Sequence, residues 1–300
     1  MLATTGGQTD ELRRRLTSLR FVLFALLGGA ERYRVAFVTP QGTRGARTVV
    51  AAPRAVLDVV AASVAPPEPD YAIRVVDDVA VLDYRACRDL ARFEAFLHKA
   101  VPRIRGSRAL IVDIRENRGG DSELNDRLWR LFARHPFRQV ASSLAKVSAR
   151  AKRTFGRPRF EAIYGEGTWR LPDGTSWYRS EAFIEPAPAA ERLRVPVFLL
   201  IGPGTMSSAF GCAVAAKEFG IARLVGEPTA EPIVTTGEVL ALRCARSGLA
   251  YNVTTKLYFG SDHGTSIVGV QPDVLVPTSS ADLRAGRDPV FERAMELAHA

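Results

Sequence analysis

The spacing of apolar positions separates an N-terminal region from a longer core. Three elements are predicted before residue 65: a helix over 9–27, a hairpin formed by 33–38 and 48–51, and a short helix over 54–63. Three prolines within residues 65–70 then predict a stiff, extended connector. We therefore expect a helix-and-hairpin region over 1–64, a linker over 65–70 and a core over 71–300.

In the core, short apolar runs alternate with segments of helical period. Two residues, Asp77 and Asp78, separate the first two runs and predict a hairpin. The predicted strands are 72–76, 79–84, 109–114, 195–201, 223–225 and two within 239–258; the predicted helices are 89–101, 122–132, 207–219 and 288–298. Runs that are apolar throughout, such as 109–114, are typical of parallel strands covered on both faces. The order of elements predicts an α/β core with a mostly parallel sheet.

Residues 142–192 do not follow this pattern. The segment contains Trp169, Trp177 and several glycines and prolines, and it has no clear period. We expect a long insertion or lid with some strand content, because long loops inside compact domains are usually functional.

Composition and charge exclude several classes of protein. The net charge is +9, but the arginines are spread along the chain, and the clusters at 13–15 and 149–159 are not interleaved with aromatic residues. We interpret this charge as a solvated surface and reject nucleic acid as the primary ligand. The three cysteines form neither a disulfide framework nor a zinc pattern. No metal and no cofactor are expected.

The first 30 residues allow two interpretations. Basic residues 13–20, the apolar run 21–27 and the small residues 28–30 are similar to a signal peptide. The run is too short to cross a membrane, and we favour an ordinary helix that ends at Gly28. A cytoplasmic location is therefore favoured, and the cell envelope stays open.

Two glycine-rich turns follow buried strands. Gly119 and Gly120 come after strand 109–114, and such a turn lets backbone amides approach a ligand at the carboxyl edge of the sheet. The second turn ends in Ser207 and Ser208, after strand 195–201 and at the start of a helix. A serine there lies in positive potential that favours an oxyanion, or it simply caps the helix.

Two carboxylates are expected near the same edge. Glu227 belongs to Val225–Thr229, which follows the third parallel strand, and Glu238 opens the next strand. Either side chain could orient a base or bind an arginine.

These motifs together resemble the tail-specific, or C-terminal processing, serine peptidases of class S41. The family pattern D-x-R-x-N-x-G-G corresponds to residues 113–120, and its T/S-x-S-S/A-A turn corresponds to 205–209. Its V-G-E-P-T motif corresponds to 225–229, and its G-V-x-P-D motif corresponds to 269–273. A bacterial subgroup ends in S-T-K-x-F and G-x-D-P-V, to which residues 254–259 and 286–290 are similar. The resemblance covers residues 71 to 290.

The resemblance implies a fold and a set of roles. The core would be a crotonase/ClpP-like spiral, and the N-terminal helix and hairpin would be a PDZ-like remnant. Ser207 would be the nucleophile, and the oxyanion donors would lie at Gly119, Gly120 and Ser208. Thr205, Glu227 and Glu238 would contact the substrate.

The general base is where this chain departs from the family. Processing peptidases place a lysine three residues after the threonine of V-G-E-P-T, and here that position is Pro232. The glutamate that often follows S-S-A is replaced by Phe210. Lys256, on a predicted strand, and His263, in a polar loop, are the remaining candidates for the base. The alternative interpretation is that each is an ordinary solvent-exposed residue.

The sequence therefore predicts a serine peptidase that acts on a peptide or protein through an acyl-enzyme. The alternative is a catalytically silent member that binds peptides or a partner protein in the same cleft. A weaker alternative is a crotonase-type acyl-CoA enzyme.

Overall fold

The computed structural model describes residues 31–39, 43–50, 69–260 and 268–300. The predicted helices over 9–27 and 54–63 and most of the predicted linker lie outside these residues. Strand β1 (Arg32–Val38) pairs with the antiparallel strand β2 (Arg44–Val50), which confirms the hairpin predicted in the N-terminal region.

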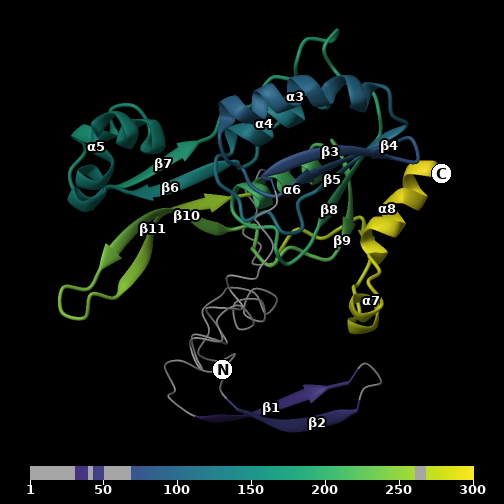
Figure 1. The fold of residues 1–300 in the computed structure, drawn as a ribbon. Coiled ribbons are helices and arrows are strands. Elements are labelled where there is room, and N and C mark those ends of the chain that lie inside the picture. The colour runs from purple at the N-terminus through teal and green to yellow at the C-terminus, as the bar shows by residue number, and fades with distance from the viewer. Residues whose placement is uncertain (1–30, 40–42, 51–68, 261–267) are drawn as a thin grey trace.

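A six-stranded sheet forms the centre of the core (Figure 1). Its strands, in spatial order, are β12 (Val274–Leu275), β9 (Arg223–Gly226), β8 (Val197–Ile201), β5 (Ala109–Asp113), β4 (Val79–Tyr84) and β3 (Tyr71–Val76). Every neighbouring pair is parallel except β3 and β4, which form the predicted hairpin around Asp77 and Asp78. Both aspartates have positive φ, as the tight two-residue turn requires. The mostly parallel α/β sheet is thus confirmed.

Both faces of the sheet are covered by helices. Three helices lie on one face: α3 (Leu90–Arg105), α4 (Glu123–Arg130) and α6 (Ser208–Glu218). Helix α8 (Pro289–His299) lies on the other face. Alternate residues of β5 point to opposite faces, so Leu110 and Val112 pack under the three helices while Ala109 and Ile111 pack under α8. This two-sided burial explains why the strand is apolar throughout.

A second, four-stranded antiparallel sheet extends to one side of the main sheet (Figure 1). Its strands, in spatial order, are β10 (Thr235–Arg243), β11 (Ala250–Phe259), β6 (Ser142–Lys146) and β7 (Ser176–Ser180). Helix α5 (Ala149–Tyr164) packs against it through Phe160 and Tyr164, and the 3₁₀ turn η2 (Thr168–Arg170) packs against the same cluster through Trp169. The segment 142–192 therefore has the predicted strand content, and it shares its sheet with strands from the C-terminal half.

Two elements were not predicted. The backbone of α5 is broken at Gly156, which has φ 69° and ψ 162°, and Pro158 follows, so the helical period is interrupted in the sequence. Helix α7 (Ser280–Arg284) has one turn only, and a capping box between Ser279 and Asp282 stabilises its start. By contrast, α8 begins as predicted: the Asp288 side chain accepts a hydrogen bond from the Phe291 amide, and Pro289 follows directly.

Candidate active site

Two turns that are far apart in the sequence meet at the carboxyl edge of the main sheet. The Met206 amide donates to the Asn117 carbonyl oxygen at 3.0 Å and joins the turn after β8 to the turn after β5. A Cβ atom at Gly119 would lie 2.6 Å from the Ser207 Cβ and 2.7 Å from the Ser208 nitrogen. The two turns are therefore in van der Waals contact, and glycine is required at position 119 for this approach.

Ser207 lies at the junction of β8 and α6 in a strained conformation. Its φ is 55° and its ψ is −126°, values that residues with a side chain rarely adopt. The side chain is exposed, and it does not cap α6. Within the described residues, its hydroxyl has no hydrogen-bond partner. A serine on a strained strand-to-helix turn with a free, exposed hydroxyl is the arrangement that presents a nucleophile.

The backbone amides around Ser207 fall into two groups. The Gly119 amide donates to the Asn117 Oδ1 at 2.8 Å, so it is occupied inside the protein. In the part of the chain that the structure describes, the amides of Gly120 and Ser208 donate to no acceptor. Of the three expected oxyanion donors, the structure thus leaves two amides available and gives Gly119 a different role, the close approach of the two turns.

Gly120 is packed against the loop after β4. A Cβ atom at this position would lie 2.0 Å from the Cys87 carbonyl oxygen, and φ is +139°. On the other side, the Ser208 hydroxyl donates to the Gly120 carbonyl oxygen at 2.6 Å. These contacts fix the Gly120 carbonyl group and keep the Gly120 amide next to the start of α6.

A buried network of amide side chains positions Ser208. Asn125 donates from its Nδ2 atom to the Ser208 carbonyl oxygen at 2.8 Å and to the Gln139 Oε1 at 3.0 Å. Gln139 in turn donates to the Asp126 carboxylate at 2.5 Å, and Tyr84 donates to Asn125 at 3.0 Å. Burial raises the Asp126 pKa from 3.8 to about 6, although the bond from Gln139 opposes this shift. No motif in the sequence indicates this network.

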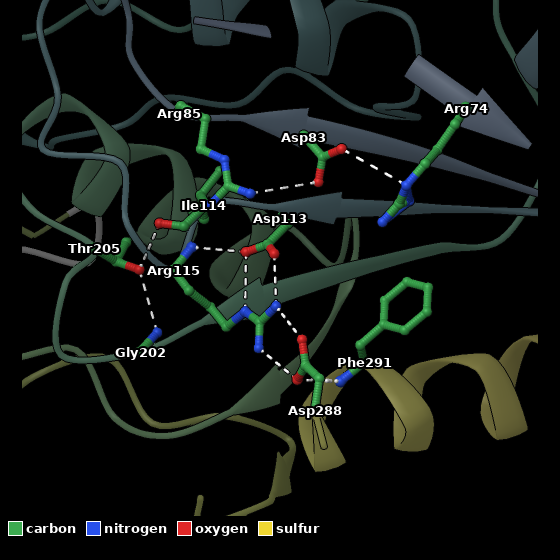
Figure 2. Close-up of polar contacts among 10 residues, drawn as sticks. All are labelled: Arg74, Asp83, Arg85, Asp113, Ile114, Arg115, Gly202, Thr205, Asp288 and Phe291. Atoms are coloured by element: carbon green, nitrogen blue, oxygen red, sulfur yellow. Dashed lines mark hydrogen bonds and ion pairs between the residues drawn. The ribbon is translucent and has the colours of Figure 1, made fainter. Parts of the chain in front are cut away.

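An ion-pair network fixes the turn after β5 to α8 (Figure 2). Arg115 donates to both carboxylate oxygens of Asp113 and to both of Asp288, with distances of 2.7 to 3.0 Å. The Arg115 guanidinium lowers the Asp288 pKa against the effect of burial. Two of the sequence motifs therefore meet here, and their charged residues are structural partners.

The motifs 225–229 and 269–273 also meet. The Val270 amide donates to the Thr229 hydroxyl at 2.8 Å, and the Thr229 amide donates to the Val270 carbonyl oxygen at 3.1 Å. Asp273 accepts from the Leu224 amide at 2.8 Å and pairs with Lys217. These contacts close the sheet beside β9.

Glu231 is the carboxylate that contacts residue 207, and the sequence analysis missed it. Its Oε2 accepts a hydrogen bond from the Ser207 amide, and its Oε1 accepts from the Thr235 hydroxyl. The residue is 8% exposed, and burial raises its pKa above the ordinary value of 4.5. Glu231 immediately precedes Pro232, so the signal that could have found it is a carboxylate adjacent to the expected base position.

The two predicted bases are placed differently from Glu231. The Lys256 ammonium donates to the Ile163 carbonyl oxygen of α5 and lies 5.7 Å and 5.5 Å from the ring centroids of Tyr164 and Tyr258. Burial lowers the pKa of Lys256, but its contacts belong to the four-stranded sheet and α5. His263 lies outside the described residues. Pro232 is buried and forms a bridge with Gly269.

The three residues expected to contact substrate have separate environments. Thr205 is fully buried and donates to the Ile114 carbonyl oxygen at 3.0 Å, so its hydroxyl ties the two turns together (Figure 2). Glu227 is half-buried at the end of β9, and burial raises its pKa. Glu238, with φ 53°, accepts a hydrogen bond from the Tyr258 hydroxyl at 2.9 Å in the four-stranded sheet.

Two features are absent from the described residues: a metal-binding group of side chains and a membrane-spanning helix. In residues 31–39, 43–50, 69–260 and 268–300, no three His, Cys, Asp or Glu side chains are grouped so as to bind a metal ion. Over the same ranges, no helix has the length and the apolar character needed to span a membrane.

Comparisons with known proteins concern the family and the fold. The sequence profile of peptidase family S41 matches residues 78–276. A search of curated proteins found no match. The crystal structure of a Parabacteroides merdae protein assigned as a peptidase has a TM-score of 0.57 at 14% identity, with 97% of this chain and 89% of that chain covered. Mature CPAF has a TM-score of 0.53 at 16% identity, with 89% of this chain and 66% of that chain covered.

Proposed function

Because the chain belongs to peptidase family S41, which supports a protease function, we propose that it is a serine peptidase with Ser207 as its nucleophile. Its substrates would be peptides or proteins. The observation that carries this proposal is the free, exposed hydroxyl of Ser207 on a strained turn, in contact with the Gly119–Gly120 turn. The crotonase/ClpP-like character of the core and the PDZ-like origin of the hairpin β1–β2 stay predictions.

The proposed reaction begins with attack of the Ser207 Oγ on the peptide carbonyl carbon. The amides of Gly120 and Ser208 then donate to the oxyanion of the tetrahedral intermediate, and the positive end of α6 adds to this stabilisation. Collapse breaks the C–N bond, and the base returns the proton that it took from Ser207 to the leaving amine. The acyl group stays on Ser207 as an ester until water hydrolyses it.

We propose Glu231 as the base that takes the Ser207 proton. Its carboxylate accepts a hydrogen bond from the Ser207 amide, so it lies beside the residue whose hydroxyl would lose the proton. Its raised pKa makes it a stronger base than an exposed carboxylate. Lys256 is the second candidate, and to act it would have to leave the Ile163 carbonyl oxygen. His263 is the third, and its position is not described.

A fluorophosphonate probe, which phosphonylates the hydroxyl oxygen of an activated serine with loss of fluoride, tests the nucleophile. We expect the parent protein to be labelled, Ser207→Ala to be unlabelled and the adjacent variant Ser208→Ala to be labelled at a lower rate, because only the Ser208 hydroxyl bond to Gly120 is lost. Ser107→Ala, at the end of α3, is the control that keeps the parent rate. Equal labelling of Ser207→Ala and the parent protein would exclude Ser207.

The pH dependence of labelling tests the base. If Glu231 accepts the proton, the parent rate rises with pH through the Glu231 pKa, above 4.5, and then reaches a plateau. Glu231→Gln should lose this inflection and most of the rate, since removing a positioned base lowers rates by about 10²–10⁴-fold. Glu94→Gln, a surface partner of Arg127, should behave as the parent. An unchanged profile in Glu231→Gln would transfer the role to Lys256 or His263.

One observation favours the alternative, a silent member that binds peptides. In the described ranges no titratable side chain forms a hydrogen bond with the Ser207 hydroxyl, and the family's lysine position is the buried Pro232. This alternative predicts that the parent protein binds an unstructured peptide without cleaving it. It also predicts equal binding by Ser207→Ala.

A further inference from the structure

A large cavity lies at the opposite edge of the main sheet from Ser207. Its volume is about 1020 Å³, and its lining includes Val197 and Arg223, the first residues of β8 and β9. Parallel strands end at one edge and begin at the other, so this cavity is separate from the candidate active site. Phe219 and Gly220, which follow α6, also line it. Ligand pockets have volumes of about 300–1,000 Å³, so the space is sufficient for a small organic molecule.

The charged residues of the cavity have one sign. Four arginines and one histidine line it: Arg134, His135, Arg192, Arg194 and Arg223. No carboxylate belongs to the lining. The guanidinium groups of these arginines form no ion pair and no hydrogen bond with any residue that the structure describes. This sets them apart from Arg115 and Arg127, which are paired with carboxylates.

The C-terminal end of α6 explains only part of the positive charge around the cavity. The carbonyl end of α6 faces the cavity and carries a partial negative charge, which favours nearby cations. One or two arginines hydrogen-bonded to the last carbonyl groups of α6 would neutralise this partial charge. None of the four arginines of the cavity donates to these carbonyl groups. Four unpaired arginines around one cavity repel one another, and an anion would relieve this repulsion. Guanidinium groups match phosphate and carboxylate oxygens in a bidentate geometry.

The rest of the lining is apolar. Phe132, Leu193 and Val197 are buried, and Phe219 and Ile221 are half-buried. A bare inorganic anion would use the arginines but would leave this apolar surface without a partner. A molecule with a compact anionic group on an aromatic or aliphatic body would contact both parts.

We propose that this cavity binds a small organic anion, a phosphate monoester or a carboxylate carried on an apolar body. The anionic group contacts the arginines, among them Arg192 and Arg223, and the apolar body packs against the phenylalanines. The proposal does not depend on peptidase activity, because the cavity contains no residue of the candidate active site.

Isothermal titration calorimetry with the full chain tests the proposal. The probe is 2-naphthyl phosphate, and the two halves of the probe, inorganic phosphate and 2-naphthol, are titrated separately. We expect saturable binding of 2-naphthyl phosphate at least tenfold tighter than that of either half. Titration of 2-naphthoate in parallel determines whether phosphate or carboxylate is preferred.

Two double variants with the same change in net charge locate the site. Arg192→Gln/Arg223→Gln should weaken binding of 2-naphthyl phosphate at least tenfold, because two charge-assisted contacts are lost. Arg150→Gln/Arg153→Gln, in exposed positions of α5, should bind as the parent. Circular dichroism should show both variants folded, since none of the four side chains has an ion-pair partner among the described residues.

Three outcomes would overturn the proposal. These are no saturable binding at about millimolar probe, equal weakening by both double variants, and equal affinity for 2-naphthol and its phosphate. The same titration with Ser207→Ala should match the parent, so failure of the proposed peptidase function would leave this result unaffected.

Discussion

Replacement of Gly119 by alanine tests the contact between the two turns more directly than any change of Ser207. The backbone at Gly119 has φ +89°, and an added Cβ would lie 2.6 Å from the Ser207 Cβ, 2.7 Å from the Ser208 nitrogen and 2.9 Å from the Met206 carbonyl oxygen. Two of these three atoms belong to the backbone and the third is a Cβ atom, so none of them can move by a change of rotamer. The methyl group would therefore push the Ser207 turn away from the turn after β5.

Gly174 provides a matched control for backbone strain. It has the same φ of +89°, and an added Cβ would have no neighbour within 4 Å. Gly174→Ala should therefore lower the free energy of unfolding by the conformational cost alone, about 1–2 kcal/mol. Gly119→Ala adds overpacking, about 1–3 kcal/mol, which gives a total loss of about 2–5 kcal/mol.

Equilibrium unfolding in urea, followed by tryptophan fluorescence, measures both losses. Fluorophosphonate labelling measures the second consequence: Gly119→Ala should be labelled at least tenfold more slowly than the parent, and Gly174→Ala at the parent rate. If the two variants lost the same stability and were labelled equally, the turns would not be in contact as described, and the oxyanion site at Gly120 and Ser208 would have no basis.

Two further predictions concern the supports of the site. Arg115→Gln should lower the free energy of unfolding by about 2 kcal/mol or more, because it leaves the Asp113 carboxylate, with 8% side-chain exposure, without its cation. Arg127→Gln, which breaks an exposed pair with Glu94, should change the free energy of unfolding by less than about 1 kcal/mol. Urea unfolding measures both changes, and equal losses would contradict this prediction. Burial raises the Asp126 pKa from 3.8 to about 6, so this group favours the folded state when protonated, and its contribution falls as the pH rises from about 4 to 6. Asp126→Asn should remove that fall and stabilise the protein at pH 7 by at most about 3 kcal/mol, and a parent-like stability profile between pH 4 and 7 would refute this.

Local patterns in the sequence were sufficient to predict most of the core. Strand β5 was recognised because both of its faces are buried, and α8 because Asp288 and Pro289 mark its first turn. Helix α5 was missed because Gly156 and Pro158 break its period. The four-stranded sheet could not be predicted, because the hairpin β6–β7 joins the hairpin β10–β11 through the pairing of β6 with β11, about 100 residues further along the chain, and no local pattern records such a pairing.

The candidate site was predictable in its backbone and less so in its side chains. Glycines after buried strands indicated where the two turns would meet, and Gly119 and Ser207 do lie in contact. The partners of those turns, Asn125 and Glu231, come from other parts of the chain. No motif marks Asn125, and Glu231 is marked only by its place next to Pro232. The expected role of Gly119 changed because the Asn117 side chain, only two residues away, occupies its amide.

The conformation of Ser207 favours the active interpretation over the silent one. A non-glycine residue with φ 55° and ψ −126° costs about 1–3 kcal/mol, and such strain persists only when the surroundings impose it. Here the bonds on either side do so: Glu231 accepts from the Ser207 amide, Asn117 accepts from the Met206 amide, and Asn125 donates to the Ser208 carbonyl oxygen. A cleft that only binds peptides gains nothing from this strain, and glycine at position 207 would remove it. The proposed reaction, in which the hydroxyl acts beside two free amides, requires a side chain at this position, and this requirement would account for the conformational cost.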